Sequence, residues 1–217
     1  METAFSEPVQ EPVSPFNLNL TFTMHLSRVF AIAALLVAPY ALAGTIDVAG
    51  VKMEDSLTIY NNTLVLNGAG VVSTGKTQLY VVKIYAKKKF ASVDQLFQVP
   101  GPKRLVITAM AKEFDTAPIM KLFNRNVESQ SDKGDMAKLV PGLMSLGKIF
   151  GTYKVLKPGE SLIFDWAPYA GLVMYMDSKL LGEPFKEPEF FRAAMSIWMG
   201  ESPLEPKLRD VLLGKDS

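Results

Sequence analysis

The 217-residue sequence contains no cysteine and only one histidine. The absence of cysteine excludes disulfide bonds, a thiol nucleophile, and zinc or iron–sulfur sites held by thiolates. The single histidine, His25, lies in a segment with the pattern of a cleaved leader. The mature chain would therefore have no imidazole for a Ser–His–Asp triad or a histidine-ligated metal. We expect neither a metal nor another cofactor.

The sequence also lacks an excess of either charge. Its 23 lysines and arginines are matched by 22 aspartates and glutamates, and the two signs are interspersed. A nucleic-acid-binding protein needs a basic patch that neutralises phosphates, and this balance is too even and too mixed to supply one. We therefore expect no nucleic-acid partner.

A hydrophobic run near the N-terminus has the three-part pattern of a secretory signal. From Met24 the sequence reads MHLSRVFAIAALLVAPYALAGT, with a basic start, an apolar run and small residues before Gly44. The run is shorter than the roughly 20 apolar residues that span a bilayer, which favours cleavage over a membrane anchor. The sequence predicts a signal peptide at residues 24–43. The product would be exported, periplasmic or secreted, with no stable membrane span after cleavage.

Residues 1–23 are polar, contain proline and fit no targeting pattern. Either translation starts at Met24, or this stretch is a disordered extension. Residues 44–217 have the length of one domain with a full hydrophobic core.

Within residues 44–217, strand-like and helix-like segments come in blocks. Asp115 or Thr116 is expected to cap a helix, because apolar residues follow at helical spacing: Ile119, Leu122, Phe123 and Val127. Pro141-Gly142 is expected to kink or split the next helix. The predicted strands are 45–53, 56–60, 64–66, 79–86, 104–110, 161–166 and 172–176, with a glycine turn at 67–70; the other predicted helices are 136–150, 189–199 and 205–213, with one helical turn at 92–97. This order lacks strict βα alternation and predicts an α+β domain with a large antiparallel sheet.

One motif suggests nucleotide binding. Residues 70–77, GVVSTGKT, match the phosphate-binding pattern G-x-x-x-x-G-K-[ST], which requires a helix directly after the loop. Residues 78–85, QLYVVKIY, have the composition of a strand instead. We therefore interpret the motif as a connection between two antiparallel strands and expect no nucleotide.

Several ordered stretches resemble the chalcone isomerase-like family, in particular its exported bacterial branch. The similarity extends over residues 48–214. The matching stretches are LVLNGAG at 64–70, YVVKIY at 80–85, PGPKRL at 100–105, KPGESLIF at 157–164, EFFRAAMSIWMG at 189–200 and PLEPKLRDVLLG at 203–214. The resemblance implies an open-faced β-sandwich, in which a large antiparallel sheet has a helical layer on one face and a ligand cleft lies between them. Members include plant enzymes that cyclise chalcones to flavanones and non-catalytic binders of fatty acids.

The resemblance also implies positions for a binding site. An arginine that follows the family's Gly-Ala-Gly segment meets the substrate phenolate or the fatty-acid carboxylate, and this position falls on Val72. Tyr80 falls where the family has a tyrosine or threonine on the next strand, and it is the best candidate for a ligand contact. The alternative is a tyrosine packed at the sheet surface with its hydroxyl in water. Lys76 could supply a cation in place of the missing arginine, or it could be solvated in the turn.

The plant enzymes also use a tyrosine and an asparagine on the first long helix. The tyrosine position falls near Ala117-Pro118 and is therefore absent. The asparagine position falls near Asn124 and Asn126, either of which could contact a ligand or lie on the helix surface.

Three functions remain open on these grounds. The leading hypothesis is an exported, non-catalytic binder of a small hydrophobic or amphipathic molecule, such as a fatty acid. The second is an isomerase, an intramolecular lyase acting on a chalcone-like enone. The third is a structural or interaction module whose cleft is filled by its own side chains, so an open cleft of several hundred Å³ would argue against it.

Overall fold

The computed structural model describes residues 44–131, 136–201 and 203–215. The extension expected at 1–23 and the signal peptide expected at 24–43 lie outside these residues. The main strands are β3 (Ser56–Ile59), β4 (Asn62–Thr74), β5 (Thr77–Ala86), β6 (Lys103–Ala109), β9 (Ser161–Ala167), β10 (Gly171–Met176) and β11 (Lys179–Leu180). A short hairpin pairs β1 (Thr45–Val48) with β2 (Val51–Glu54), and a separate two-stranded sheet pairs β7 (Phe114–Asp115) with β8 (Val155–Leu156). The helices are α1 (Val93–Gln98), α2 (Ala117–Gln130), α3 (Met136–Thr152), α4 (Pro188–Met199) and α5 (Pro206–Leu212).

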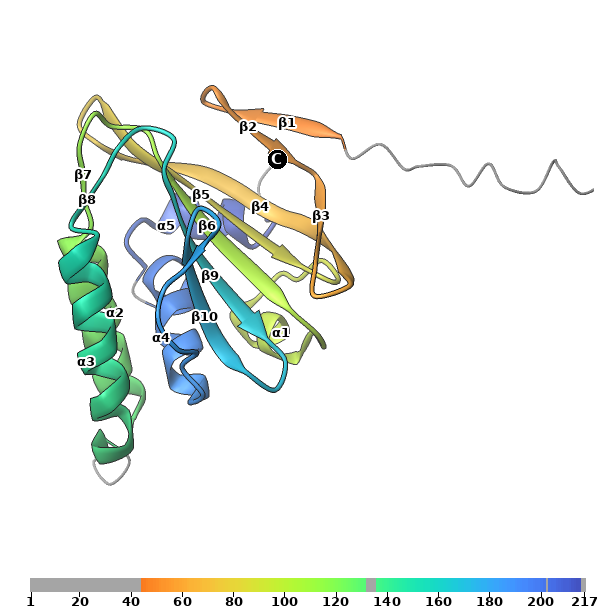
Figure 1. Ribbon diagram of the computed structural model, residues 1–217. Coiled ribbons are helices and arrows are strands. Elements are labelled where there is room, and N and C mark those ends of the chain that lie inside the picture. Colours follow the sequence, from red (N-terminus) through yellow and green to blue (C-terminus); the bar gives the residue numbers. More distant parts are fainter. Residues whose placement is uncertain (1–43, 132–135, 202, 216–217) are drawn as a thin grey trace, which may run out of the picture. The chain divides into compact units, whose positions relative to one another are not determined.

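The seven main strands form one sheet in the order β11-β10-β9-β6-β5-β4-β3. All of its neighbouring strands are antiparallel. Figure 1 shows α2 and α3 side by side and α4 behind β9 and β10. The predicted α+β class and large antiparallel sheet are confirmed. Among the described residues, no helix combines the length and the apolarity needed to cross a membrane.

Strand β5 lies near the middle of the sheet and buries side chains on both of its faces. Val82 and Ile84 point into the core beneath the helices, whereas Val81 and Tyr85 point to the opposite face. Successive side chains of a strand alternate between faces, so a strand covered on both sides reads as an almost continuous apolar run. This is why residues 79–86 are recognisable as a strand from sequence alone.

Helix α4 provides much of the core on the helix side of the sheet. Its Trp198 and Phe190 have no exposed surface. The Trp198 ring meets Phe164 of β9 with the ring centroids 6.4 Å apart. Phe190 also contacts α3, where a Cβ at Gly142 would overlap its ring. The aromatic side chains of α4 therefore fix the helical layer onto the sheet.

The β1–β2 hairpin covers part of the opposite face of the sheet. A small second core lies beneath it, made of Met53, Leu64, Leu66, Val81 and Tyr85. The hairpin occupies residues 45–54, where the sequence predicts one continuous strand. The chain reverses at Ala49 and Gly50, which both have positive φ, so the single strand 45–53 is wrong.

The predicted glycine turn at residues 67–70 is also wrong. These residues continue β4, with a register shift between Leu66 and Gly68. A Cβ at Gly68 would overlap the backbone of Val211 and Leu212, and one at Gly70 would meet Leu208. These glycines are needed because α5 packs directly on the strand.

The β4–β5 turn lies further along the chain, where Gly75 has φ of +58°. Strand β5 follows it directly, so the GVVSTGKT motif forms a hairpin without the helix that a phosphate-binding loop requires. Helix α3 continues through Pro141 as one helix, so the expectation that Pro141-Gly142 splits it is wrong.

Candidate functional site

A cleft of about 490 Å³ lies between the β4–β5 hairpin and the start of α2. We call it the β4–α2 cleft. Its lining residues are Val72, Ser73 and Thr74 of β4, Leu79 and Tyr80 of β5, Glu113, Phe114 and Asp115 around β7, Pro118, Ile119 and Leu122 of α2, and Leu204 and Glu205 ahead of α5. Most of these side chains are apolar. The cleft can therefore accommodate an apolar molecule of moderate size.

Tyr80 forms part of the cleft wall and is 2% exposed. Its hydroxyl accepts a hydrogen bond from the indole N–H of Trp198 at 3.0 Å. Its ring packs on Phe114 with the centroids 4.6 Å apart. Within the described part of the chain, the hydroxyl proton of Tyr80 has no acceptor of its own. A ligand could accept this proton.

The ionisation of Tyr80 is strongly disfavoured. Burial raises the pKa of its phenol to about 12, and the negative charge of Glu205 also acts to raise this pKa. The hydrogen bond from Trp198 opposes the rise, because it stabilises the phenolate. At neutral pH, Tyr80 is therefore an uncharged hydrogen-bond donor.

Val72 lies directly opposite Tyr80 in the pairing of β4 with β5. It is 5% exposed and lines the same cleft. The structure therefore brings together Val72 and Tyr80, two of the residues that the sequence assigned to a binding site. The side chain of Val72 offers the cleft only a small apolar surface, which cannot pair with an anion. Their contact with a ligand stays a prediction.

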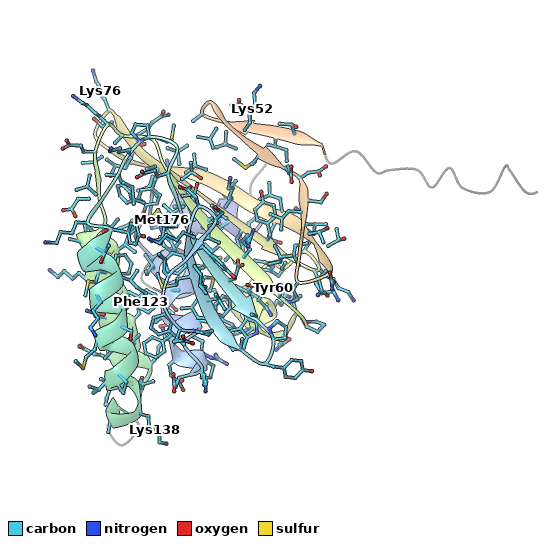
Figure 2. The ribbon with its side chains drawn as sticks, in the orientation of Figure 1. Lys52, Tyr60, Lys76, Phe123, Lys138 and Met176 are labelled. Atoms are coloured by element: carbon cyan, nitrogen blue, oxygen red, sulfur yellow. The ribbon has the colours of Figure 1, made fainter. Side chains whose placement is uncertain are left out.

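Lys76 does not line the cleft. It lies in the exposed turn between β4 and β5, and Figure 2 shows its side chain extending outward from the end of that hairpin. The position of Lys76 favours the solvated alternative over a cation that replaces the missing arginine.

Asn124 and Asn126 lie further along α2 than Leu122 and do not line the cleft either, and Asn126 instead lines a larger hollow described below. Asn126 is 7% exposed, and its amide donates to the carbonyl of Ala193 in α4 at 3.2 Å. The side-chain oxygen of Asn124 is buried without a hydrogen-bond partner in the described residues. The contact of Asn126 joins two helices and so has a structural explanation.

Sequence reasoning missed the acidic residues of the cleft. Glu113, Asp115 and Glu205 all line it, whereas none of the lysines and arginines that the structure describes does. Glu113 and Asp115 flank the buried Phe114, and this local pattern was visible in the sequence. Glu205 joins them only through the fold, because the segment before α5 lies at the other side of the cleft.

A larger hollow of about 750 Å³ lies beyond α2, among α1, α4 and the start of α5. Polar and charged side chains line it, including Arg125, Gln130, Glu201 and Arg209. Two of these side chains already form hydrogen bonds within the protein: Gln130 donates to the hydroxyl of Ser196, and Arg209 donates to the carbonyl of Met199. The smaller cleft fits an apolar ligand better, because specific sites for such ligands are mainly apolar.

A polar cluster lies apart from the cleft and the hollow, on the face of the sheet opposite the helices. Asp165 of β9 is fully buried there and accepts two hydrogen bonds from Arg104 of β6. The hydroxyl of Tyr60 donates to the same carboxylate at 3.2 Å and lies 3.1 Å from the hydroxyl of Tyr175. These groups satisfy one another, so the cluster has the properties of a structural ion pair.

Comparisons with known proteins bear on the family and the fold. A family model described as chalcone isomerase-like matches residues 45–214. Among solved structures, a fatty-acid binding protein from Arabidopsis thaliana aligns with a TM-score of 0.59 and 14% sequence identity, covering 79% of this chain and 96% of that one. A comparison with curated protein sequences gave no match. At 14% identity, the structural similarity shows a shared fold.

Proposed function

This chain belongs to the chalcone isomerase-like family, and on that premise we propose that it is a non-catalytic protein that binds a small hydrophobic molecule in the β4–α2 cleft. The observation that carries this proposal is an open cleft of about 490 Å³ with apolar walls. Typical ligand sites have about 300–1,000 Å³. This argues against the alternative of an interior filled by its own side chains.

The shared fold supports the same ligand class. The solved neighbour from Arabidopsis thaliana is a fatty-acid binding protein, so this fold accommodates a long apolar chain in at least one other protein. The apolar cleft of this chain supports a hydrophobic or amphipathic ligand. The polar end of the ligand is a separate question, because it depends on the charges that line this particular cleft.

The residues of the cleft do not favour catalysis. An anionic intermediate would need a cation or several hydrogen-bond donors, and Val72 provides neither. General acid–base work is most efficient when the group titrates near the working pH. The pKa of Tyr80, raised to about 12 by burial, is far from neutrality. We therefore place the isomerase second and the binding protein first.

The binding function is tested with the purified full-length protein. Native mass spectrometry is expected to detect a co-purifying hydrophobic molecule, and the delipidated protein is expected to bind the uncharged fluorescent probe Nile red. Leu122→Trp should fill the cleft and abolish probe binding, because Leu122 lines it from α2. Val140→Trp is the matched control, since Val140 is 47% exposed on α3 and lies outside the cleft. Equal binding by the wild type and Leu122→Trp would contradict the proposal.

We further propose that the protein acts after export. The support is the signal-peptide pattern of residues 24–43, which ends in the small residues before Gly44. In an expressing cell, the exported product is expected to begin at Gly44 when its intact mass is measured. A product that stays in the cytoplasm and retains residues 24–43 would contradict export.

A further inference from the structure

We infer that the β4–α2 cleft selects against anionic ligands and holds an apolar molecule whose polar end is uncharged or positively charged. This inference rests on the proposed binding function and specifies the chemistry of the ligand. It implies that a fatty-acid carboxylate is a poor ligand for this chain, whereas a long-chain alcohol or amine of the same length is a good one.

The charges of the cleft carry the inference. Within the described part of the chain, its lining residues include the three acids Glu113, Asp115 and Glu205 and no basic residue. Glu113 and Asp115 come from the segment ahead of α2, and Glu205 comes from the segment ahead of α5. A carboxylate that entered the cleft would therefore meet negative charge from two sides. It would find no lining cation to offset this charge.

Among the described residues, no salt bridge engages any of these three acids. Glu113 and Glu205 have no ion pair or side-chain hydrogen bond among the described residues. One carboxylate oxygen of Asp115 accepts the backbone N–H of Ala117 at 2.9 Å, which fixes its position at the start of α2. This contact with a neutral donor leaves the charge of Asp115 in place. All three carboxylates therefore contribute a negative potential at the opening of the cleft.

This potential extends to the buried wall of the cleft. The charge of Glu205 acts on Tyr80 and is one of the causes that raise the pKa of its phenol. A negative charge on the phenol oxygen is thus disfavoured by the same carboxylate that a bound anion would meet. Tyr80 also keeps its proton, so it offers a ligand one neutral hydrogen-bond donor in place of a cation. A hydroxyl or carbonyl oxygen can accept that bond without adding charge.

The size of the effect follows from the distances across such a cleft. Two exposed carboxylates and the half-buried Glu205, at several ångströms and acting through water, weaken the binding of an anion by about tenfold at low ionic strength. The discrimination should decrease as salt is added, because the charges lie near solvent.

The test uses three ligands with the same alkyl chain: decanoate, decanol and decylamine. Each is titrated into the delipidated full-length protein at low salt, below its own aggregation concentration, with displacement of Nile red as the readout. We expect decanoate to bind about tenfold more weakly than decanol, and decylamine to bind at least as tightly as decanol. Decanoate binding as tightly as decanol, or more tightly, would overturn the inference.

Variants then assign the effect to the acids. The double substitution Glu113→Gln with Glu205→Gln should reduce the ratio of decanol affinity to decanoate affinity several-fold, because it removes two of the three negative charges that line the cleft. Glu128→Gln is the control for charge, because Glu128 is an exposed acid of α2 outside the cleft. A decanoate affinity that responds equally to both sets of variants would contradict a role for the cleft acids.

The two proposals fail in different ways. If Nile red and all three decyl compounds fail to bind, the proposed binding function is wrong and the inference fails with it. If Nile red and decanol bind, decanoate binds equally well, and the glutamine variants change nothing, the binding function stands and only the charge selection is wrong.

Discussion

Arg104 holds Asp165 by two parallel hydrogen bonds, of 2.7 Å from Nε and 2.6 Å from the guanidinium NH2 group. The carboxylate of Asp165 has no exposed surface, whereas the side chain of Arg104 is 22% exposed. The two residues face each other on β6 and β9. The pair therefore joins two central strands on the side of the sheet that the helices do not cover.

We predict that removing Arg104 is more damaging than removing both partners. Arg104→Met should lower the free energy of unfolding by about 3 kcal/mol, because it leaves a buried carboxylate without its cation. The double substitution Arg104→Met with Asp165→Leu should recover part of that loss. Urea denaturation of the single and double variants measures both effects. A double variant less stable than Arg104→Met alone would show that the pair does not act as a buried ion pair.

A second prediction concerns the glycines. Gly68→Ala should destabilise the protein by about 2 kcal/mol or more, because the added methyl group would overlap the backbone of α5 at Val211 and Leu212. Gly151→Ala is the matched control, since a Cβ there meets no atom within 4 Å. Gly151 lies in α3, where alanine is favoured over glycine by up to about 1 kcal/mol. Thermal unfolding should show opposite shifts for the two variants, and shifts of the same sign would contradict this account.

How much of the fold the sequence reveals depends on whether the deciding contact is local. The strand at 79–86 and the helix from Ala117 were predicted correctly, because their signals are periodic patterns within a few residues. Gly68 and Gly70 were misassigned to a turn, because the reason for them is contact with α5, far along the chain. Pro141 was expected to kink or split α3, and one lost backbone hydrogen bond does not split a helix that is packed against its neighbours.

In the candidate site too, some features could be predicted from the sequence and others depend on contacts between distant parts of the chain. The family resemblance assigned Val72 and Tyr80 to one site, and the structure puts both in the wall of the same cleft. Lys76 does not join them, because it lies in the exposed turn of the hairpin. Asn124 and Asn126 lie further along α2 than Leu122, and Asn126 lines the larger hollow instead. The three acids of the cleft could not be grouped from sequence, since Glu205 lies far from Glu113 until the chain folds.

A third prediction is a pH dependence that arises from Lys103. This residue is 3% exposed, and its ammonium donates to the carbonyl of Gly101 at 3.0 Å. Burial lowers its pKa from the ordinary value of 10.5 to about 8. Between pH 8 and pH 10 the unfolded chain therefore binds more protons at this lysine than the native protein does, so its contribution to stability rises with pH. Below pH 8 the native protein carries the full cost of burying the charge.

The comparison of the wild type with Lys103→Met isolates this contribution. The variant is expected to be more stable than the wild type at pH 7, and the difference should shrink as the pH approaches 10. Lys121→Met, at an exposed position of α2, should show no such trend. The window ends at pH 10 because the pKa values of Tyr80 and Tyr85, both raised by burial to about 12, lower stability above that pH. Parallel stability curves for the wild type and Lys103→Met would contradict the assignment.

The last prediction separates the structural role of Tyr80 from its role in binding. Tyr80→Phe should cost about 1–3 kcal/mol of stability, because the buried indole N–H of Trp198 loses its acceptor. The control is Tyr85→Phe on the same strand, whose lost hydroxyl donates to the carbonyl of Glu54 at 3.0 Å on the opposite face of the sheet. Both variants should be destabilised in urea, but only Tyr80→Phe should weaken the binding of decanol. Equal decanol affinity in the two variants would leave Tyr80 with a structural role alone and would remove the hydrogen-bond donor from the cleft.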